Sequence, residues 1–208
     1  MARVNQELNC QFLGSAHTLV DSNKIQCLVA ENPVYERNNL RVFETPKDGH
    51  SYFMTVDVSR GRGLDYSAVI VFDVTAMPFK VVATYKDNNV SPMELPTLIY
   101  NLGMQYKEAL VMIEANDLGE SVANELWWTL EYSGVLHTKD GKIGGSGILG
   151  VKTTKGVKNR GCSKVKELIE NDQLIVSDRR IIEELEGYVL GKKGTYEAQN
   201  TKINDDLC

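Results

Sequence analysis

The stretch from Tyr52 to Asp73 constrains the fold more than any other part of the chain. Two apolar runs, Tyr52 to Asp57 and Ser67 to Asp73, flank a turn that contains two glycines. Runs rich in β-branched and aromatic residues favour strands, and glycines favour the turn between them. The first run ends in a carboxylate, Asp57. The pattern predicts a hairpin with an acid at its mouth, which is a good place to hold a metal ion.

Further elements extend this hairpin into a mixed sheet. A third strand is predicted from Lys80 to Lys86, and a helix is expected to begin at Ser91-Pro92. A buried fourth strand follows from Ala109 to Glu114, and another helix from Glu120 to Tyr132. Short connections make the first three strands an antiparallel meander, whereas the intervening helix makes the fourth parallel to the first. We therefore expect an α/β fold with a mixed sheet flanked by helices.

The last third of the chain gives more local signals. The dipeptide Asp140-Gly141 predicts a hairpin turn. Helices are expected from Ser163 to Asn171 and, capped by Asp178, from Arg179 to Val189. The segment from Gly156 to Ser163 has the glycine spacing of a phosphate-binding loop. It lacks the lysine that must follow the second glycine and has no preceding strand, so we expect an ordinary loop.

Length and composition are those of a globular protein. A chain of 208 residues, 42% hydrophobic and 25% charged, can bury the core of one large domain. We expect residues 1–48 to be an N-terminal extension that packs on the main body or serves as a linker, and residues 49–208 to be the main domain. Four scattered cysteines argue against a structural zinc site and fit a reducing compartment. The sequence shows no membrane span of roughly 20 residues and no signal peptide, so we expect a soluble intracellular protein without a membrane partner.

Three acidic positions are candidates for a metal centre. Asp57 ends the first strand, Glu114 ends the fourth, and Asp205 and Asp206 lie near the end of the sequence. Parallel neighbouring strands would bring Asp57 and Glu114 to one edge of the sheet, where a C-terminal aspartate could join them. Clustered carboxylates repel unless a cation neutralises them, and oxygen ligands select Mg²⁺ or Mn²⁺. Two such ions about 4 Å apart would support phosphodiester hydrolysis. Taken alone, Asp57 is more simply a turn acid, but a second strand ending in an acid favours function.

Other residues near these acids are weaker candidates. Asp65, across the hairpin turn, could take a second metal ion, and Arg60 and Arg62 in the same loop could contact a phosphate or screen the acids. Between positions 139 and 166 eight basic residues accompany one acid. A basic segment without interleaved aromatic residues suits DNA phosphates and predicts little sequence specificity, although a formal net charge of -5 is unusual for a nucleic-acid-binding protein. The candidate DNA-binding residues are Lys139, Lys142, Lys152, Lys155, Lys158, Arg160, Lys164 and Lys166.

The motifs together resemble a known family. The segments Val-Asp57-Val-Ser-Arg-Gly-x-Gly-x-Asp65-Tyr-Ser, Val-Met-Ile-Glu114-Ala-Asn and Asn-Asp-Asp-Leu are similar to the nuclease domain of the terminase large subunit, above all that of T-even-like tailed phages. The resemblance covers about residues 50–208 and implies an RNase H/RuvC-integrase-like fold. It implies metal-dependent cleavage of concatemeric viral double-stranded DNA, with Mg²⁺ or Mn²⁺ held by Asp57, Glu114 and either Asp205 or Asp206.

The resemblance also implies a setting. Expected partners are double-stranded DNA, the portal, the small terminase subunit and the motor's own ATPase domain, on the viral prohead in the cytoplasm of the infected host. The ATPase would lie upstream of this sequence, and residues 1–48 would include its linker. Many relatives carry histidine where Asn204 stands. Asparagine does not exchange protons near neutral pH, which places a proton-transfer role at that position in doubt.

Three alternatives stay open from the sequence. A Holliday-junction resolvase or an RNase H-type nuclease would use the same fold. An actin-like or sugar-kinase-like nucleotide binder also opens with an acid-ended strand and a glycine turn, but it needs two such domains. A non-catalytic DNA-binding or docking module would keep the basic segment and lack metal affinity.

Overall fold

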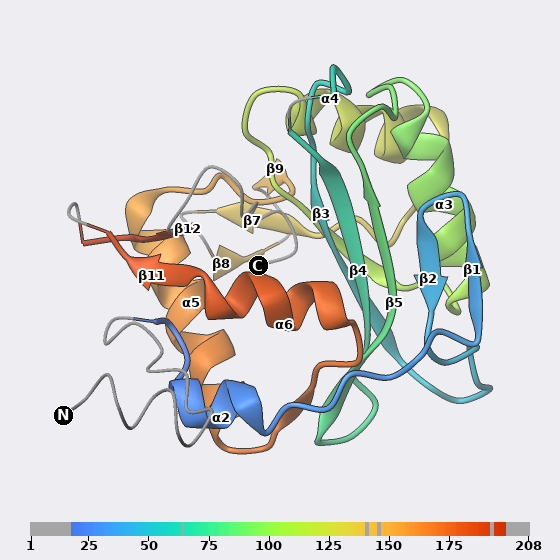
Figure 1. The fold of residues 1–208 in the computed structure, drawn as a ribbon. Coiled ribbons are helices and arrows are strands. Elements are labelled where there is room, and N and C mark those ends of the chain that lie inside the picture. The colour runs from blue at the N-terminus through green and yellow to red at the C-terminus, as the bar shows by residue number, and fades with distance from the viewer. Residues whose placement is uncertain (1–17, 64, 140–141, 145–146, 192–193, 199–208) are drawn as a thin grey trace, which may run out of the picture.

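A seven-stranded mixed sheet forms the centre of the molecule in a computed structural model of the chain (Figure 1). The structure describes residues 18–63, 65–139, 142–144, 147–191 and 194–198. Six strands lie in the order β1-β2-β5-β4-β3-β6, and β10 pairs with β5. Their bounds are β1 Tyr35–Arg37, β2 Leu40–Val42, β3 Tyr52–Asp57, β4 Ser67–Asp73, β5 Phe79–Asp87, β6 Leu110–Ile113 and β10 Leu174–Ile175.

The strand register confirms the predicted meander and the parallel fourth strand. Strands β3 and β4 pair antiparallel up to the Asp57–Ala68 pair, and β4 pairs antiparallel with β5. Strand β6 runs parallel to β3 and ends with Val56 opposite Ile113. The region before residue 48 contributes two short strands: β1 pairs with β2, and β2 joins the sheet beside β5. The domain boundary at residue 48 stays a prediction.

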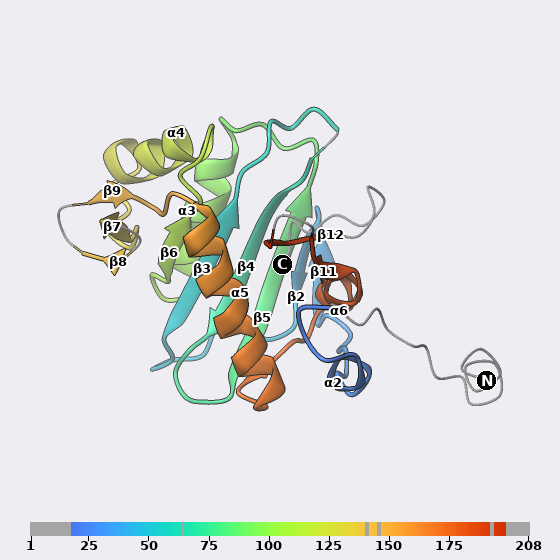
Figure 2. The ribbon, with the colours of Figure 1, turned by 90° about the vertical axis from the view of Figure 1, so that its left-hand side faces the viewer.

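Helices cover both faces of the sheet (Figures 1 and 2). One apolar core lies under α3 (Leu95–Gln105), α4 (Gly119–Asn124) and the π-helical turn η1 (Glu125–Thr129). The other lies under α2 (Ser22–Gln26), α5 (Lys155–Glu170) and α6 (Arg179–Glu186). Alternate side chains of the central strands supply both cores, because successive residues of a strand point to opposite faces. No helix within the described residues is both long and apolar enough to cross a membrane.

Two small sheets complete the fold. The first has the strand order β8-β7-β9. Its β7–β8 pair is the hairpin predicted around Asp140-Gly141, two residues that lie outside the described part of the chain. The second pairs β11 with β12. The bounds are β7 His137–Lys139, β8 Lys142–Ile143, β9 Ile148–Leu149, β11 Tyr188–Leu190 and β12 Tyr196–Ala198.

The expected loop at residues 156–163 and the helix start at Ser163 are wrong. Helix α5 already begins after Thr154, whose hydroxyl oxygen accepts a hydrogen bond from the Val157 amide. The helix buries Cys162 and Ile169 against the second core, and this packing outweighs the weak helix propensity of its two glycines. Ser163 lies inside the helix, where its hydroxyl donates to the Asn159 carbonyl.

Three other helices differ from expectation at their ends. Helix α3 begins at Leu95 rather than at Ser91. A turn precedes it, in which the Ser91 hydroxyl accepts from the Met93 amide and the Ser91 carbonyl accepts from the Glu94 amide. The helix predicted from Glu120 to Tyr132 consists of α4 and η1 and ends at Thr129. Helix α6 ends at Glu186, so residue 189 belongs to β11.

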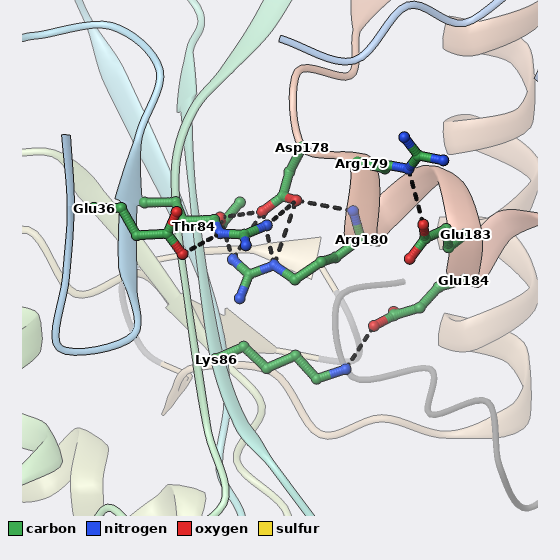
Figure 3. A network of polar contacts seen from close by, with 9 residues as sticks. Glu36, Thr84, Lys86, Asp178, Arg179, Arg180, Glu183 and Glu184 are labelled. Atoms are coloured by element: carbon green, nitrogen blue, oxygen red, sulfur yellow. Dashed lines mark hydrogen bonds and ion pairs between the residues drawn. The ribbon is translucent and has the colours of Figure 1, made fainter. Parts of the chain in front are cut away.

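Helix α6 is attached to the sheet by a buried polar network (Figure 3). Asp178 is fully buried and caps the helix by accepting from the Arg180 amide at 2.8 Å. The same carboxylate accepts from the Thr84 hydroxyl on β5 and from the Arg180 guanidinium, and Arg41 on β2 lies 3.4 Å away. The predicted cap is confirmed, and it also ties α6 to two strands of the sheet.

Candidate metal centre

Asp57 and Glu114 lie at the carboxyl ends of two neighbouring strands, at one edge of the sheet. Asp57 is the last residue of β3, and Glu114 comes directly after β6, the parallel neighbour of β3. The Glu114 amide donates to the Val56 carbonyl at 2.9 Å, which continues the parallel register to these two residues. Both side chains are half-buried. The structure therefore places the two predicted strand-end acids on adjacent strands at the same edge.

The loop after β6 holds the Glu114 side chain in place. Asn116 donates from its side-chain amide to Glu114 Oε1 at 2.7 Å and to the Thr153 carbonyl at 3.4 Å. The loop is also tight, because a Cβ atom on Gly119 would lie 1.7 Å from the Glu114 carbonyl oxygen. Residues 114–118 form this turn between β6 and α4. The contact with Thr153 joins this turn to the segment that leads into α5.

The residues present fit a hard divalent cation. Within the described part of the chain, Glu114 has an amide donor and no ion pair with a lysine, arginine or histidine. A half-buried carboxylate beside a second acid is costly without a cation, and two carboxylates offer the oxygen ligands that Mg²⁺ or Mn²⁺ prefers. Among the described residues, no three His, Cys, Asp or Glu side chains form a group that could hold a metal ion. Asp205 and Asp206, the predicted third ligand, lie outside the described residues.

Asp65 and Arg60, two of the weaker candidates in the β3–β4 turn, have different surroundings. Asp65 is exposed in the turn across from Asp57. Arg60 forms an ion pair with Asp117, with 2.8 Å between Arg60 Nη2 and Asp117 Oδ2. The sequence left open whether Arg60 meets a phosphate or screens the acids and did not single out Asp117.

The structure divides the basic stretch into three parts. Lys152 follows Val151, which forms a parallel bridge with Glu114, and Lys155 and Lys158 lie in the first turns of α5. Arg160, Lys164 and Lys166 lie farther along this helix, and at 1.5 Å per residue Lys166 is about 17 Å beyond Lys155. Lys164 and Lys166 are in ion pairs with Glu167 and Glu170. Lys139 and Lys142 form a cross-strand pair in the β7–β8 hairpin.

A cavity of about 620 Å³ lies elsewhere, between the β1–β2 hairpin and α3. Tyr35, Leu40, Tyr85, Leu98 and Leu102 contribute to its lining. Neither strand-end acid lines this cavity, so it is separate from the candidate metal centre.

Solved structures share this fold. The large terminase nuclease from thermophilic phage G20c with bound magnesium has a TM-score of 0.71 and 18% identity, and the match covers 93% of each chain. The same nuclease with bound cobalt gives 0.70 at 18% identity and the same coverage. The large terminase nuclease domain of Thermus phage P74-26 gives 0.65 at 21% identity, covering 88% of this chain and 87% of that one. At these identities the likeness shows the fold, and the expected RNase H-like architecture is confirmed.

The amino-acid sequence itself matches a family. The family described as "Terminase RNaseH-like domain" matches residues 54–207, well over half of the chain, and the match includes all three acidic positions singled out above. A special closeness to T-even-like phages stays a prediction. The chain belongs to the family of terminase RNase H-like domains.

Proposed function

We propose that this chain is a metal-dependent endonuclease that cuts concatemeric viral double-stranded DNA during genome packaging. The observation that carries the proposal is the placement of Asp57 and Glu114 on adjacent strand ends in a terminase-family domain. Mg²⁺ or Mn²⁺ is the proposed cofactor, with Asp205 or Asp206 as the third ligand and Asp65 as a further candidate for a second ion. The G20c nuclease, which shares the fold, has been solved with bound magnesium, cobalt and zinc.

The described end of the chain lies beside α5, the helix whose start follows the segment next to Glu114. Ala198 pairs with Tyr188, and the Lys158 ammonium lies 5.6 Å from the centre of the Tyr188 ring. Lys158 is on α5, whose first turn follows the segment that Asn116 ties to Glu114. Asp205 comes seven residues after Ala198, and an extended chain of that length spans up to about 25 Å. This length of chain, which starts beside α5, supports the proposal that the C-terminal segment completes the site.

The roles of the chain's own residues follow from their positions. Asp57 and Glu114 would bind the metal, and the Asn116 amide would keep the Glu114 carboxylate oriented toward it. When bound, a divalent ion would lower the pKa of a coordinated water and stabilise the leaving oxygen. Lys152, Lys155 and Lys158 would attract the DNA backbone from the adjacent start of α5. Phosphate contacts of this kind carry no base information, so we propose cleavage with little sequence specificity.

The proposed setting is the packaging motor in the cytoplasm of the infected bacterium. The double-stranded DNA substrate, the portal, the small terminase subunit and the ATPase domain are the proposed partners. In this arrangement residues 1–48 contain the connection to the ATPase domain and contribute β1 and β2 to the nuclease sheet.

Plasmid nicking tests the proposed function. We expect the purified chain to convert supercoiled DNA to nicked and linear forms with Mn²⁺ or Mg²⁺, because a bound metal would activate a water and stabilise the leaving oxygen. EDTA should stop cutting, and fresh metal should restore it. Cutting that persists in EDTA would contradict the proposal. DNA binding without metal affinity or cutting would favour the docking module, and a strong preference for branched DNA or RNA–DNA hybrids would favour a resolvase or RNase H.

A further inference from the structure

An exposed ion pair joins the two loops that follow the strand-end acids. Arg60, three residues after Asp57, donates from Nη2 and Nε to Asp117 Oδ2 at 2.8 and 3.3 Å. Asp117 stands three residues after Glu114. Each acid is thus followed, at the same interval, by one member of the pair. The two side chains are 62% and 65% exposed, so both can exchange partners with solvent or a ligand.

The backbone that presents Arg60 is fixed on both sides. The Ser59 amide donates to the Ser67 hydroxyl at 3.0 Å, and the Gly61 amide donates to the Ser59 hydroxyl at 3.3 Å. Gly61 has a φ of +62°, and a Cβ atom there would lie 2.2 Å from the Val90 carbonyl oxygen. Arg60 therefore stands on an anchored turn, and only its side chain is free to change direction.

The loop that presents Asp117 is equally constrained. Asp117 has a φ of 49°, a left-handed conformation that aspartate and asparagine tolerate better than most residues. Two residues after Asp117, Gly119 packs closely against the Glu114 carbonyl. Both partners are therefore held beside the metal-binding edge whether or not they contact one another.

Exchange of Asp117 for a DNA phosphate on Arg60 is energetically favourable. An exposed ion pair contributes roughly 0–1 kcal/mol to stability, so breaking it costs little. Arginine binds a phosphate through two parallel hydrogen bonds, with the same fork geometry that it presents to a carboxylate. A DNA phosphate that arrives at the strand edge can replace Asp117 on Arg60 without a change in the fold.

We propose that Arg60 is a phosphate-binding residue of the nuclease and that Asp117 forms an ion pair with it until DNA binds. Asp117 is then a competitor that lowers the affinity for DNA in the resting state. Arg60 would hold the DNA backbone over the edge where Asp57 and Glu114 lie. This inference rests on the proposed function, since it takes double-stranded DNA as the ligand.

Fluorescence anisotropy of a labelled 20-base-pair duplex in EDTA tests the exchange without cleavage. We expect Arg60→Ala to weaken binding about fivefold or more and to reduce the slope of log affinity against log salt by about 1. Asp117→Asn should tighten binding severalfold, and this gain should disappear in the Arg60→Ala background because the two residues act on the same contact.

The exposed Arg179–Glu183 pair on α6 provides matched controls, with 3.0 Å between Arg179 Nε and Glu183 Oε1. Arg179→Ala and Glu183→Gln should leave affinity nearly unchanged. The inference is overturned if Arg60→Ala behaves like Arg179→Ala, or if Asp117→Asn tightens binding equally without Arg60, which would be a general charge effect.

The nicking assay separates this inference from the proposed function. A parent protein that binds and cuts DNA, with Arg60→Ala neutral in binding, overturns the inference alone. A parent protein that shows the expected binding pattern but never cuts overturns the proposed nuclease alone. A parent protein that binds no DNA contradicts both.

Discussion

Replacing Asp57 with asparagine is expected to reduce metal-dependent nicking by about 10³-fold or more. The change keeps the size of the side chain and removes the charge that would hold the ion. Stabilisation by a metal ion is worth several kcal/mol in the transition state, and each 1.4 kcal/mol is a factor of ten in rate. The nicking rate of supercoiled plasmid with Mn²⁺ is the measurement, with thermal unfolding as the check that the variant folds.

Asp87→Asn is the matched control for this substitution. Asp87 ends β5, and its register partner, Ser67, lies next to Ala68, the partner of Asp57. Its carboxylate accepts from the Asn89 amide at 2.8 Å, a bond that an asparagine oxygen can also accept. We expect this variant to cut at nearly the parent rate. Equal cutting by the parent and Asp57→Asn proteins would remove Asp57 from the metal centre.

Replacing Asp178 with alanine is expected to lower the free energy of unfolding by about 3–5 kcal/mol, the cost of breaking a buried ion pair by removing one partner. The carboxylate is fully buried and bonds the Arg180 guanidinium, the Arg180 amide and the Thr84 hydroxyl (Figure 3). Its removal leaves the Arg180 amide, Arg180 Nε and the Thr84 hydroxyl without this acceptor and the helix uncapped. Urea unfolding measures the loss. Asp48→Ala removes a 99%-exposed carboxylate from an ion pair with Lys107 and should leave the free energy of unfolding nearly unchanged.

The same carboxylate gives the stability a pH dependence. Burial by itself raises the pKa of Asp178, but hydrogen bonds from Arg180 and Thr84 outweigh burial, so the pKa in the folded protein is lowered. A lowered folded pKa means that the carboxylate's contribution is complete above the ordinary aspartate pKa of about 3.9 and is lost as pH falls through the lower folded pKa. The stability difference between parent and Asp178→Asn proteins should therefore shrink in acid. A difference that stays constant from neutral pH to pH 2 would contradict this role.

The central strands could be predicted from sequence because their signals are local and strong. The apolar runs ending at Asp57 and Glu114 have the length and composition of buried strands, and the connections fix their directions. Because parallel neighbouring strands end at the same edge of a sheet, both acids could be placed at that edge. The start of α5 could not be predicted in this way, since Gly156 and Gly161 resemble a loop and the helix depends on packing by Cys162 and Ile169.

The surroundings of the acids depend on contacts between distant segments. The bond from Asn116 to the Thr153 carbonyl joins residues 37 positions apart, and the Arg60–Asp117 pair joins residues 57 apart. Nothing in the local sequence marks such partners, because they meet only when the β3–β4 turn, the β6–α4 loop and the start of α5 come together. The placement of Asp57 and Glu114 at adjacent strand ends could be predicted, whereas the contacts around them could not.

A crystal of the full chain soaked in Mn²⁺ tests the metal centre most directly. We expect anomalous density at the carboxyl ends of β3 and β6, within ligand distance of Asp57 and Glu114, with one carboxylate from Asp205 or Asp206 completing the site. Density for Mn²⁺ elsewhere, or none at this edge, would contradict the proposed metal centre.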